Sequence, residues 1–568
     1  MWPRLSDVAG AAASAVQPAV ALTAQPAPAT TSGVLRTPLL SKAAWERRAR
    51  AAFWLAFALV AALGIAVSLR VTTPGHWDAI NNLTTARNIA EGRGYVSDFV
   101  QQLAVPMPLP GPETVRPPGV PFLMAGLFAI FGQSLVLEVL LSIIVLLAAA
   151  FTLRTAIRVA GGGWVGDVAG VVLLLAHNDY EVRSLWNNVF LSLIAALFLL
   201  VLVRSEQGRW TGWPLVIGCA ALASVAFLMK QTQLLGPVPF VLLLLATDRR
   251  WPLRRRLVQG VGFLLLFAAL TAPYWLTNLI EHGQALYSPI QGLRLPARYG
   301  LLPLDRWHRT LLYGAPAFTY GSVLHTIGAR AMLKIELSHW RELAEAILAL
   351  NPFIVAWAAA GALFIRRRDW RVYALVAALC IPPVFDAMYW VVERRYLWPL
   401  LPCLLFMAWL TVRGFRDWRS GGIGPRFALR LRRALGVVIA AALLAALVSF
   451  IRSWRWDIIA ARAPIPGWIS AVLRDVPPGA VVMTAAPPEL DWWTRRKSVI
   501  APLGPRRDVL AVAERYDAQY YLDTESNTPE HAVSFAPGDL RLVDRGPGWR
   551  LYVISAANPP SATARPRD

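Results

Sequence analysis

The residues with the clearest chemical potential lie between the first two long apolar runs, in the segment 72–121. Asp78 opens an amphipathic stretch there, and Arg116 precedes the sequence PPG. A carboxylate at a membrane face can accept a proton from an attacking hydroxyl or amine. A guanidinium carries a fixed positive charge and a fork of donors that matches a phosphate. These are the groups needed to move a sugar from a lipid phosphate to an acceptor, and they favour a membrane enzyme over a passive channel.

Helical spacing after Asp78 would place Asn82 and Thr85 on the face that carries Asp78. An apolar stripe suited to lying flat on a bilayer would occupy another face: Ile80, Leu83, Ala86 and Ala90. Two alternatives stay open. Asp78 could instead complement a helix dipole, and Arg116 could be an anchor whose charge reaches water at the bilayer rim.

Two further positions interrupt the charge pattern of the chain. Lys230 ends an apolar run and is followed by only the polar residues QTQ before the next run. Polar residues held at membrane depth are functional candidates, and lysine is scarce in this arginine-rich chain. Arg395 and Tyr396 open a later apolar run in the same way. All three are predicted to contact a lipid phosphate.

The bulk composition excludes an ordinary soluble domain. The chain has 568 residues, of which 56% are hydrophobic, and apolar runs near the length needed to cross about 30 Å of hydrocarbon recur along it. The formal charge of +22 comes largely from arginine clusters between these runs. That placement is the positive-inside pattern of membrane proteins, so no nucleic-acid partner is predicted. The three cysteines lie within apolar runs and show neither disulfide nor metal-ligand spacing.

Placing the arginine-rich connections in the cytoplasm predicts about eleven spans. The run 118–131 is excluded because about 14 apolar residues are too few to span, so a re-entrant or juxtamembrane helix is expected there. An odd number of spans with the N-terminus inside places the C-terminus outside a cytoplasmic membrane. The spans are expected near 51–69, 135–153, 165–177, 187–203, 213–229, 233–247, 257–277, 352–365, 371–390, 396–412 and 434–451.

The predicted fold class is therefore an α-helical polytopic membrane protein with a small C-terminal extracytoplasmic α/β domain. Strands are expected near 480–484, 520–522 and 549–554, and a helix near 506–516. A long outer loop is expected over 278–351. The expected organisation is a disordered cytoplasmic tail at 1–50, a membrane domain at 51–451 with its first outer loop at 70–134, the α/β domain at 452–558, and a polar tail at 559–568.

Taken together, these residues make the chain resemble the GT-C superfamily of glycosyltransferases. The resemblance is greatest to the polytopic group that contains protein O-mannosyltransferases and lipid A aminoarabinose transferases. It extends over roughly 51–451, and the order of four short motif sets carries it. These are DAINNLTTAR at 78–87 with EGRG at 91–94; RPPGVP at 116–121 with FG at 131–132; APYW at 272–275 with HG at 282–283 and SP at 288–289; and RYLWP at 395–399 with Pro402.

The resemblance implies a role for each matching residue. Asp78 would be the catalytic acid of the first loop, and Arg116 the basic residue that contacts a polyprenyl phosphate. Lys230, Arg395 and Tyr396 would make further contacts with the phosphate or the sugar. The side chains expected to contact substrate are Asn82, Arg87, Asn187, Asn188 and His282.

Three departures from the family pattern leave details open. Ala79 follows Asp78 where relatives often have a second acid, and Asn187 and Asn188 stand where another acid is common. Val115 occupies a position that some relatives use to bind metal. No metal site or cofactor is therefore assigned, although a divalent cation stays open, as do the sugar and the acceptor.

The leading hypothesis is a glycosyltransferase of the cell envelope. It would take a sugar from a polyprenyl-phosphate donor at the extracytoplasmic face and pass it to a glycan, lipid or protein acceptor. Its other partner is the bilayer. The alternatives are a transporter or flippase of lipid or polysaccharide, and a polymerase or ligase that uses a polyprenyl-diphosphate donor.

Overall fold

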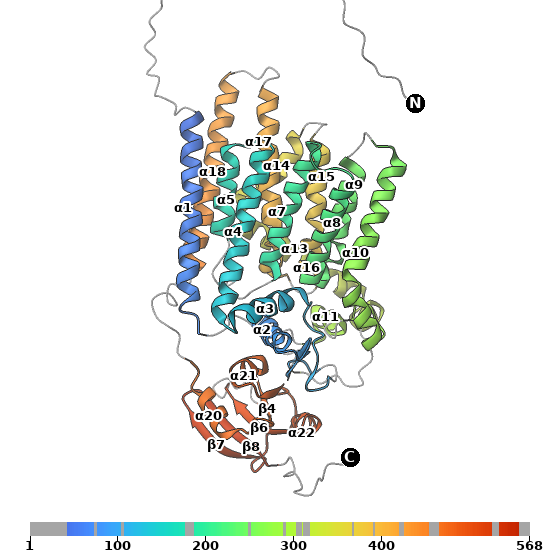
Figure 1. The fold of residues 1–568 in the computed structure, drawn as a ribbon, viewed down its shortest axis with the longest axis vertical. Helices are drawn as coiled ribbons and strands as arrows, with labels where there is room; N and C mark the ends of the chain where they lie inside the picture. The colour runs from blue at the N-terminus through green and yellow to red at the C-terminus, as the bar shows by residue number, and fades with distance from the viewer. Residues whose placement is uncertain are drawn as a thin grey trace, which may run out of the picture.

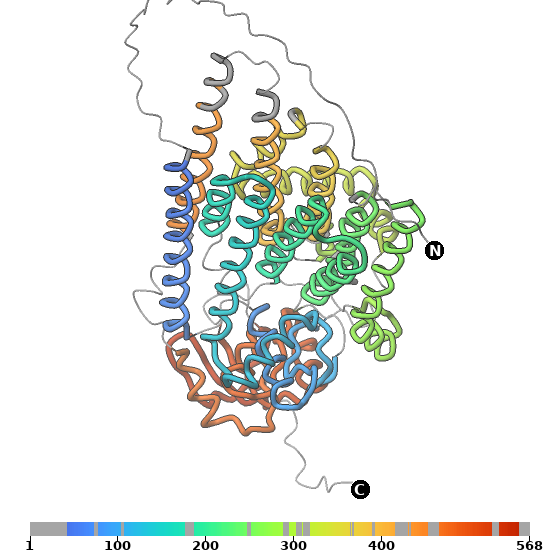
Figure 2. Tube along the Cα trace, turned by 45° about the horizontal axis from the view of Figure 1, so that its top comes forward, coloured from blue at the N-terminus to red at the C-terminus, as the bar shows by residue number. Residues whose placement is uncertain are grey.

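The protein consists of a helical bundle, a layer formed by the first loop, and a C-terminal sheet domain (Figure 1). The C-terminal domain lies against the first-loop layer, at the end of the bundle opposite the start of the first helix (Figures 1 and 2). The computed structural model describes residues 42–72, 77–103, 107–176, 187–247, 251–287, 291–302, 309, 319–365, 369–389, 392–419, 425–453, 465–524 and 533–555.

Each of the eleven predicted spans contains a helix, but the number of spans is not confirmed. Among the described residues, six helices are long and apolar enough to cross a membrane, or up to seven if a pair bent by 106° counts as one span. The apolar parts of the remaining bundle helices, such as Leu400–Gly414 in α17, are shorter than a span requires. The bundle helices are α1 (Lys42–Ser68), α4 (Leu135–Val159), α5 (Trp164–Ala176), α7 (Asn187–Glu206), α8 (Trp213–Met229), α9 (Pro237–Thr247), α10 (Leu253–His282), α14 (Pro352–Phe364), α15 (Trp370–Leu379), α16 (Ile381–Tyr389), α17 (Leu400–Arg419) and α18 (Pro425–Ser453).

Local capping explains where several of these helices begin. The Ser134 hydroxyl accepts a hydrogen bond from the Val136 amide at the start of α4, and the Asn351 side chain accepts one from the Ile354 amide at the start of α14. The short 3-10 helices η1 (Gln231–Leu235) and η3 (Arg394–Leu397) precede α9 and α17. Each breaks an apolar run at the polar residues that the sequence singled out.

The first loop folds into a separate layer beneath the bundle (Figure 1). It contains α2 (Trp77–Ala90) and α3 (Gly119–Phe131), which pack against each other, together with the paired strands β1 (Val96–Ser97) and β3 (Gly111–Pro112). The predicted short helix near 118–131 is thus present as α3, outside the set of helices long enough to span.

The sequence predicted a long outer loop over 278–351, but the described part of this segment is mostly helical. Its described part holds α11 (Gln291–Arg298), α12 (Tyr320–Ile327) and α13 (Ala329–Leu350). Leu343 and Leu350 of α13 are buried in a cluster with Leu397 and Leu400. This apolar face explains why the segment forms a helix that packs against η3.

The C-terminal domain is an α/β sheet with helices, as predicted, and the strand order is β2-β5-β4-β6-β8-β7. The first four strands in this order run parallel to one another. Strand β8 is antiparallel to both of its neighbours, β6 and β7. The unexpected member is β2 (Phe99–Val100), which comes from the first loop and pairs with β5. The domain itself contributes α20 (Trp468–Asp475), β4 (Val481–Thr484), α21 (Pro487–Thr494), β5 (Lys497–Ile500), α22 (Arg506–Arg515), β6 (Ala518–Asp523), β7 (Leu540–Gly546) and β8 (Trp549–Ile554).

Candidate active site

Asp78 lies between two arginines that are far apart in the sequence. Its Oδ1 is 2.5 Å from Nη2 of Arg116, and its Oδ2 is 3.6 Å from Nη1 of Arg395. Arg395 also pairs with Glu393 through its Nε. The Asp78 and Arg116 side chains remain 30% and 21% exposed, so this ion pair is accessible from outside the protein. The carboxylate and guanidiniums predicted at one membrane rim therefore meet.

Glu113 supports the backbone of Arg116. Its Oε1 accepts hydrogen bonds from the backbone amides of Val115 and Arg116, at 2.7 and 3.0 Å, and its Oε2 accepts one from the Thr85 hydroxyl at 3.5 Å. Thr85 belongs to the α2 face that carries Asp78. Burial raises the pKa of Glu113, whereas these hydrogen bonds and the Arg116 charge oppose that rise. The turn that presents Arg116 is thus tied to the helix that presents Asp78.

Gly119 brings this turn close to Lys230. A Cβ atom at Gly119 would lie 2.7 Å from the Leu228 carbonyl oxygen, so only glycine allows α3 to begin so near the end of α8. The side-chain amide of Asn187 donates to the Met229 carbonyl in the same place. The RPPG motif and the lysine are therefore neighbours in space.

Lys230 is surrounded by polar and aromatic groups. Its Nζ pairs with the Asp386 carboxylate, donates to Asn188 Oδ1 at 3.2 Å, and lies 3.8 Å from the centre of the Tyr396 ring. Asp386 is buried and also accepts from the Thr232 hydroxyl at 2.8 Å. The aromatic face and the carboxylate both attract the positive charge of the lysine.

The Lys230 and Asp78 groups are joined through Tyr396. The Arg395 guanidinium donates to the Tyr396 hydroxyl at 3.3 Å, while Lys230 lies over the Tyr396 ring. The predicted residues Asp78, Arg116, Lys230, Arg395, Tyr396 and Asn188 are thus linked by direct contacts.

Two other predicted residues lie beside this cluster. Asn82 shares the Asp78 face of α2 and is buried, and its Oδ1 has no hydrogen-bond partner within the part of the chain that the structure describes. His282 stacks on Tyr287 with ring centres 4.0 Å apart, and the Tyr287 carbonyl accepts from Gln231, the neighbour of Lys230. His282 therefore reaches the cluster only through Tyr287 and Gln231.

Arg87 is placed differently from the prediction. Its guanidinium is buried and binds both carboxylate oxygens of Asp491 at 2.8 Å, along with the Asp491 carbonyl at 3.1 Å. Nine helical positions separate Arg87 from Asp78, which is about two and a half turns, so the two side chains point to opposite sides of α2. The geometry supports an interdomain contact for Arg87 in place of the predicted substrate contact.

The sequence did not single out three residues of the cluster. Glu113 is two positions from Val115, where an acid was sought, and Asp386 is one acid within an apolar run. Tyr274 lies in the APYW motif and receives a hydrogen bond from Gln231. The interruption of an apolar run by a carboxylate was a signal for Asp386, by the reasoning that identified Lys230.

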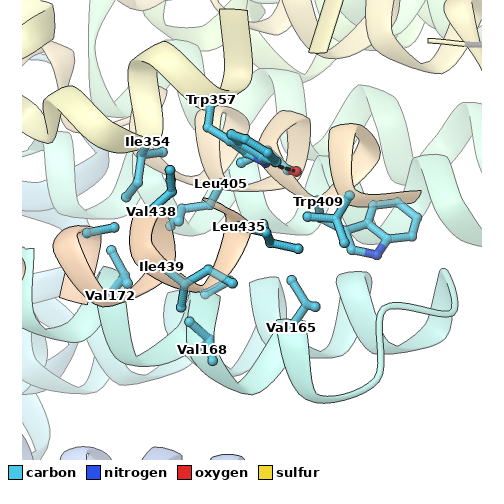
Figure 3. Close-up of a pocket in the computed structure, with 14 residues that line it drawn as sticks. Val165, Val168, Val172, Ile354, Trp357, Leu405, Trp409, Leu435, Val438 and Ile439 are labelled. Atoms are coloured by element: carbon cyan, nitrogen blue, oxygen red, sulfur yellow. Dashed lines mark hydrogen bonds between the residues drawn. The ribbon is translucent and has the colours of Figure 1, made fainter. Parts of the chain in front are cut away.

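The described residues contain no group of three or more His, Cys, Asp or Glu side chains that could hold a metal ion. Asp179 and Glu181 are two acids of the sequence that lie outside the described residues. A separate pocket between α5, α14, α17 and α18 is lined only by apolar side chains, among them Val172, Trp357 and Ile439 (Figure 3). Such a lining carries no acid, base or cation for a reaction.

Part of the chain is similar in sequence to a known family. Residues 115–275 match the family of dolichyl-phosphate-mannose-protein mannosyltransferases. The matched stretch contains the RPPG motif that begins at Arg116, Lys230 and the APYW motif. No match was found among curated protein sequences.

Two solved structures are similar to this chain in fold. The archaeal oligosaccharyltransferase AglB from Archaeoglobus fulgidus, in complex with an inhibitory peptide and a dolichol-phosphate, gives a TM-score of 0.52 at 12% identity, over 84% of this chain and 70% of that chain. ArnT from Cupriavidus metallidurans, bound to undecaprenyl phosphate, gives 0.50 at 14% identity, over 89% of this chain and 98% of that one. These two likenesses show the fold, and together with the match to the mannosyltransferase family they support the predicted resemblance to the GT-C superfamily.

Proposed function

We propose that this GT-C-fold membrane protein is a glycosyltransferase that takes a sugar from a polyprenyl-phosphate carrier. The observation that carries the proposal is the position of Asp78 between Arg116 and Arg395, with Lys230 joined to them through Tyr396. The two structural neighbours contain a dolichol-phosphate and undecaprenyl phosphate, which is consistent with a lipid phosphate as the ligand of these cations.

The proposed reaction is a displacement at the anomeric carbon. The acceptor hydroxyl or amine forms the new bond to this carbon, the bond from the carbon to the phosphate oxygen breaks, and polyprenyl phosphate leaves. Asp78 accepts the acceptor's proton or orients its attacking atom. By analogy to the superfamily, the configuration inverts.

The cations have a separate role on the leaving group. Negative charge grows on the phosphate as the bond breaks, and Arg116, Arg395 and Lys230 offer fixed positive charge to it. Cations held in a partly buried site interact more strongly with this charge than cations in bulk water. We assign the site to the extracytoplasmic face, with the N-terminus in the cytoplasm, because the positive-inside pattern predicts cytoplasmic arginine-rich connections and α1 begins at the end of the bundle opposite the first-loop layer (Figure 1).

The experiment uses purified full-length protein in detergent with a radiolabelled polyprenyl-phosphosugar and a panel of glycan, lipid and protein acceptors. We expect acceptor-dependent release of free polyprenyl phosphate by the wild type, and its loss in Asp78→Asn. Glu345→Gln is the matched control, because Glu345 is an exposed acid of α13 that pairs with Arg341.

The same assay separates the alternatives. A transporter would bind the lipid without releasing free polyprenyl phosphate. Turnover that needs a polyprenyl diphosphate would indicate the polymerase or ligase. Full activity of Asp78→Asn would remove Asp78 from the role proposed for it.

A further inference from the structure

Helix α2 has two functional sides that face opposite directions. Asp78, Asn82 and Thr85 share the side that meets Arg116 and Glu113. Arg87 points the other way, into α21 of the C-terminal domain. The position of the proposed base therefore depends on what holds the rear of this helix.

The contact behind α2 is a buried, bidentate ion pair between Arg87 and Asp491. The Arg87 and Asp491 side chains are 2% and 1% exposed, and the guanidinium meets both carboxylate oxygens and the Asp491 carbonyl. Bidentate pairing fixes orientation as well as distance. Asp491 is thus too deeply buried to contact an acceptor in this arrangement.

Three other contacts join the first loop to the same domain. Strand β2 pairs with β5, and the Ser498 amide donates to the Asp98 carbonyl at 3.2 Å. Arg495, just after α21, pairs with Glu91 at 3.0 Å. The Trp492 ring lies 6.4 Å from that of Phe128 in α3. Opening the domain as a lid would break all of these contacts together with the buried pair.

We propose that the C-terminal domain is a fixed brace for α2, and that Arg87 and Asp491 are positioning residues for Asp78. This inference rests on the proposed function only in assigning a reaction to Asp78. In the proposed reaction the donor phosphate would meet Lys230, which follows α8, and Arg395 of η3 as well as Arg116 of the first loop. Loosening α2 should therefore reduce the rate of transfer more than it reduces donor affinity.

The test compares full-length wild type, Arg87→Gln and Arg474→Gln. Arg474 is the matched control, because it pairs with Asp475 and Asp544 on the exposed surface of the same domain. Hydrogen exchange is measured over 77–103, and kcat and the donor KM are measured in the release assay.

In Arg87→Gln we expect exchange over 77–103 to rise by about tenfold or more while the bundle helices are unchanged. We expect kcat to fall by about 10²-fold, as a small misplacement of a reacting group can produce, with a donor KM within about threefold of wild type. Arg474→Gln should match wild type in all three measurements.

Unchanged exchange in Arg87→Gln would overturn the proposal, and so would raised exchange with wild-type kcat. Equal losses in kcat and donor affinity would also overturn it, because they indicate general unfolding. If Arg87→Gln does not fold, Arg87→Lys keeps the charge but lacks the bidentate fork, and should shift both measurements in the same direction by less. The exchange arm needs no substrate, so a wild type that releases no polyprenyl phosphate defeats the proposed function and leaves the brace testable.

Discussion

Helix α2 carries an ion pair between an aspartate and an arginine on each side, and the two pairs differ in how far they are exposed to solvent. Asp78–Arg116 is partly exposed, and Asp78 is shared with a second guanidinium. Arg87–Asp491 is sealed from solvent, and Asp98 supplies a second carboxylate 3.9 Å from Arg87 Nη2. An accessible, shared pair can exchange partners with an incoming phosphate or hydroxyl. A sealed pair cannot, but it can hold a helix in place.

The comparison shows how one short element serves both the reaction and the structure. Charges at an exposed site contribute little to folding, because water competes with each partner. A buried pair that loses one partner leaves an uncompensated charge, which is strongly destabilising. Substitutions on the two sides of α2 should therefore have opposite signatures.

The largest expected effect is on catalysis, from Asp78→Asn. The kcat of sugar transfer should fall by about 10²–10⁴-fold, the range contributed by a positioned base. The free energy of unfolding should change less than in a variant of the buried Arg87 pair, since the Asp78 and Arg116 side chains are 30% and 21% exposed. Thermal unfolding in detergent measures the second quantity, and a large destabilisation would mean that Asp78 is structural.

The opposite signature is expected for Asp491→Asn. Breaking the buried pair should lower the stability of the docked C-terminal domain by about 3–5 kcal/mol. Thermal unfolding and limited proteolysis report this loss, and Arg474→Gln supplies the exposed pair for comparison. Equal stability of the two variants would show that the Arg87 pair does not hold the domain.

A smaller effect is expected from Lys230→Gln on donor binding. Loss of one charge-assisted contact to phosphate should raise the donor KM by about 10–100-fold. A smaller fall in kcat should accompany it, because part of the phosphate charge develops only as the bond breaks. Asp386→Asn should act in the same direction but more weakly, because Lys230 keeps its contacts with Asn188 and Tyr396. A fall in kcat alone would instead place Lys230 in the chemical step.

The smallest effect is a shift in pH dependence from Glu113. Burial raises the pKa of this carboxyl, so it takes up a proton at higher pH than an exposed glutamate. Protonation weakens its hydrogen bonds to the Arg116 turn, so kcat/KM should fall on acidification. Glu113→Gln should lack that acid limb, and an unchanged pH profile would contradict this role.

The stability of the first loop should respond to pH in the opposite direction and increase on acidification. A raised folded-state pKa means that the contribution of Glu113 to stability is full below the pKa of the unfolded chain. It is lost as pH rises through the folded-state pKa. Thermal unfolding of wild type and Glu113→Gln across this range checks the sign.

The sequence predicted one side of α2 better than the other. Asp78 and Arg116 belong to one loop, and residue type alone indicated complementary roles at a membrane rim. Lys230 was found because a lone lysine interrupts an apolar run. Arg87 was misplaced because its partner Asp491 lies 404 positions away, and local spacing carries no information on such a contact.

The fold could be predicted to a similar extent. Apolar runs located every helix of the bundle, and β-rich segments located three strands of the C-terminal sheet. The number of spans was not fixed, because short helices such as α5 and bent pairs such as α13 and α14 cannot be told from full spans by hydropathy. Strand β2 has only two residues and depends wholly on pairing with β5.

The most direct test of the central claim is an experimental structure of the full chain with polyprenyl phosphate bound. We expect density for the phosphate in contact with Arg116, Arg395 and Lys230, with Asp78 facing the side from which an acceptor would approach. A phosphate bound elsewhere, with the Asp78 pairs undisturbed and no contact to any of these cations, would contradict it.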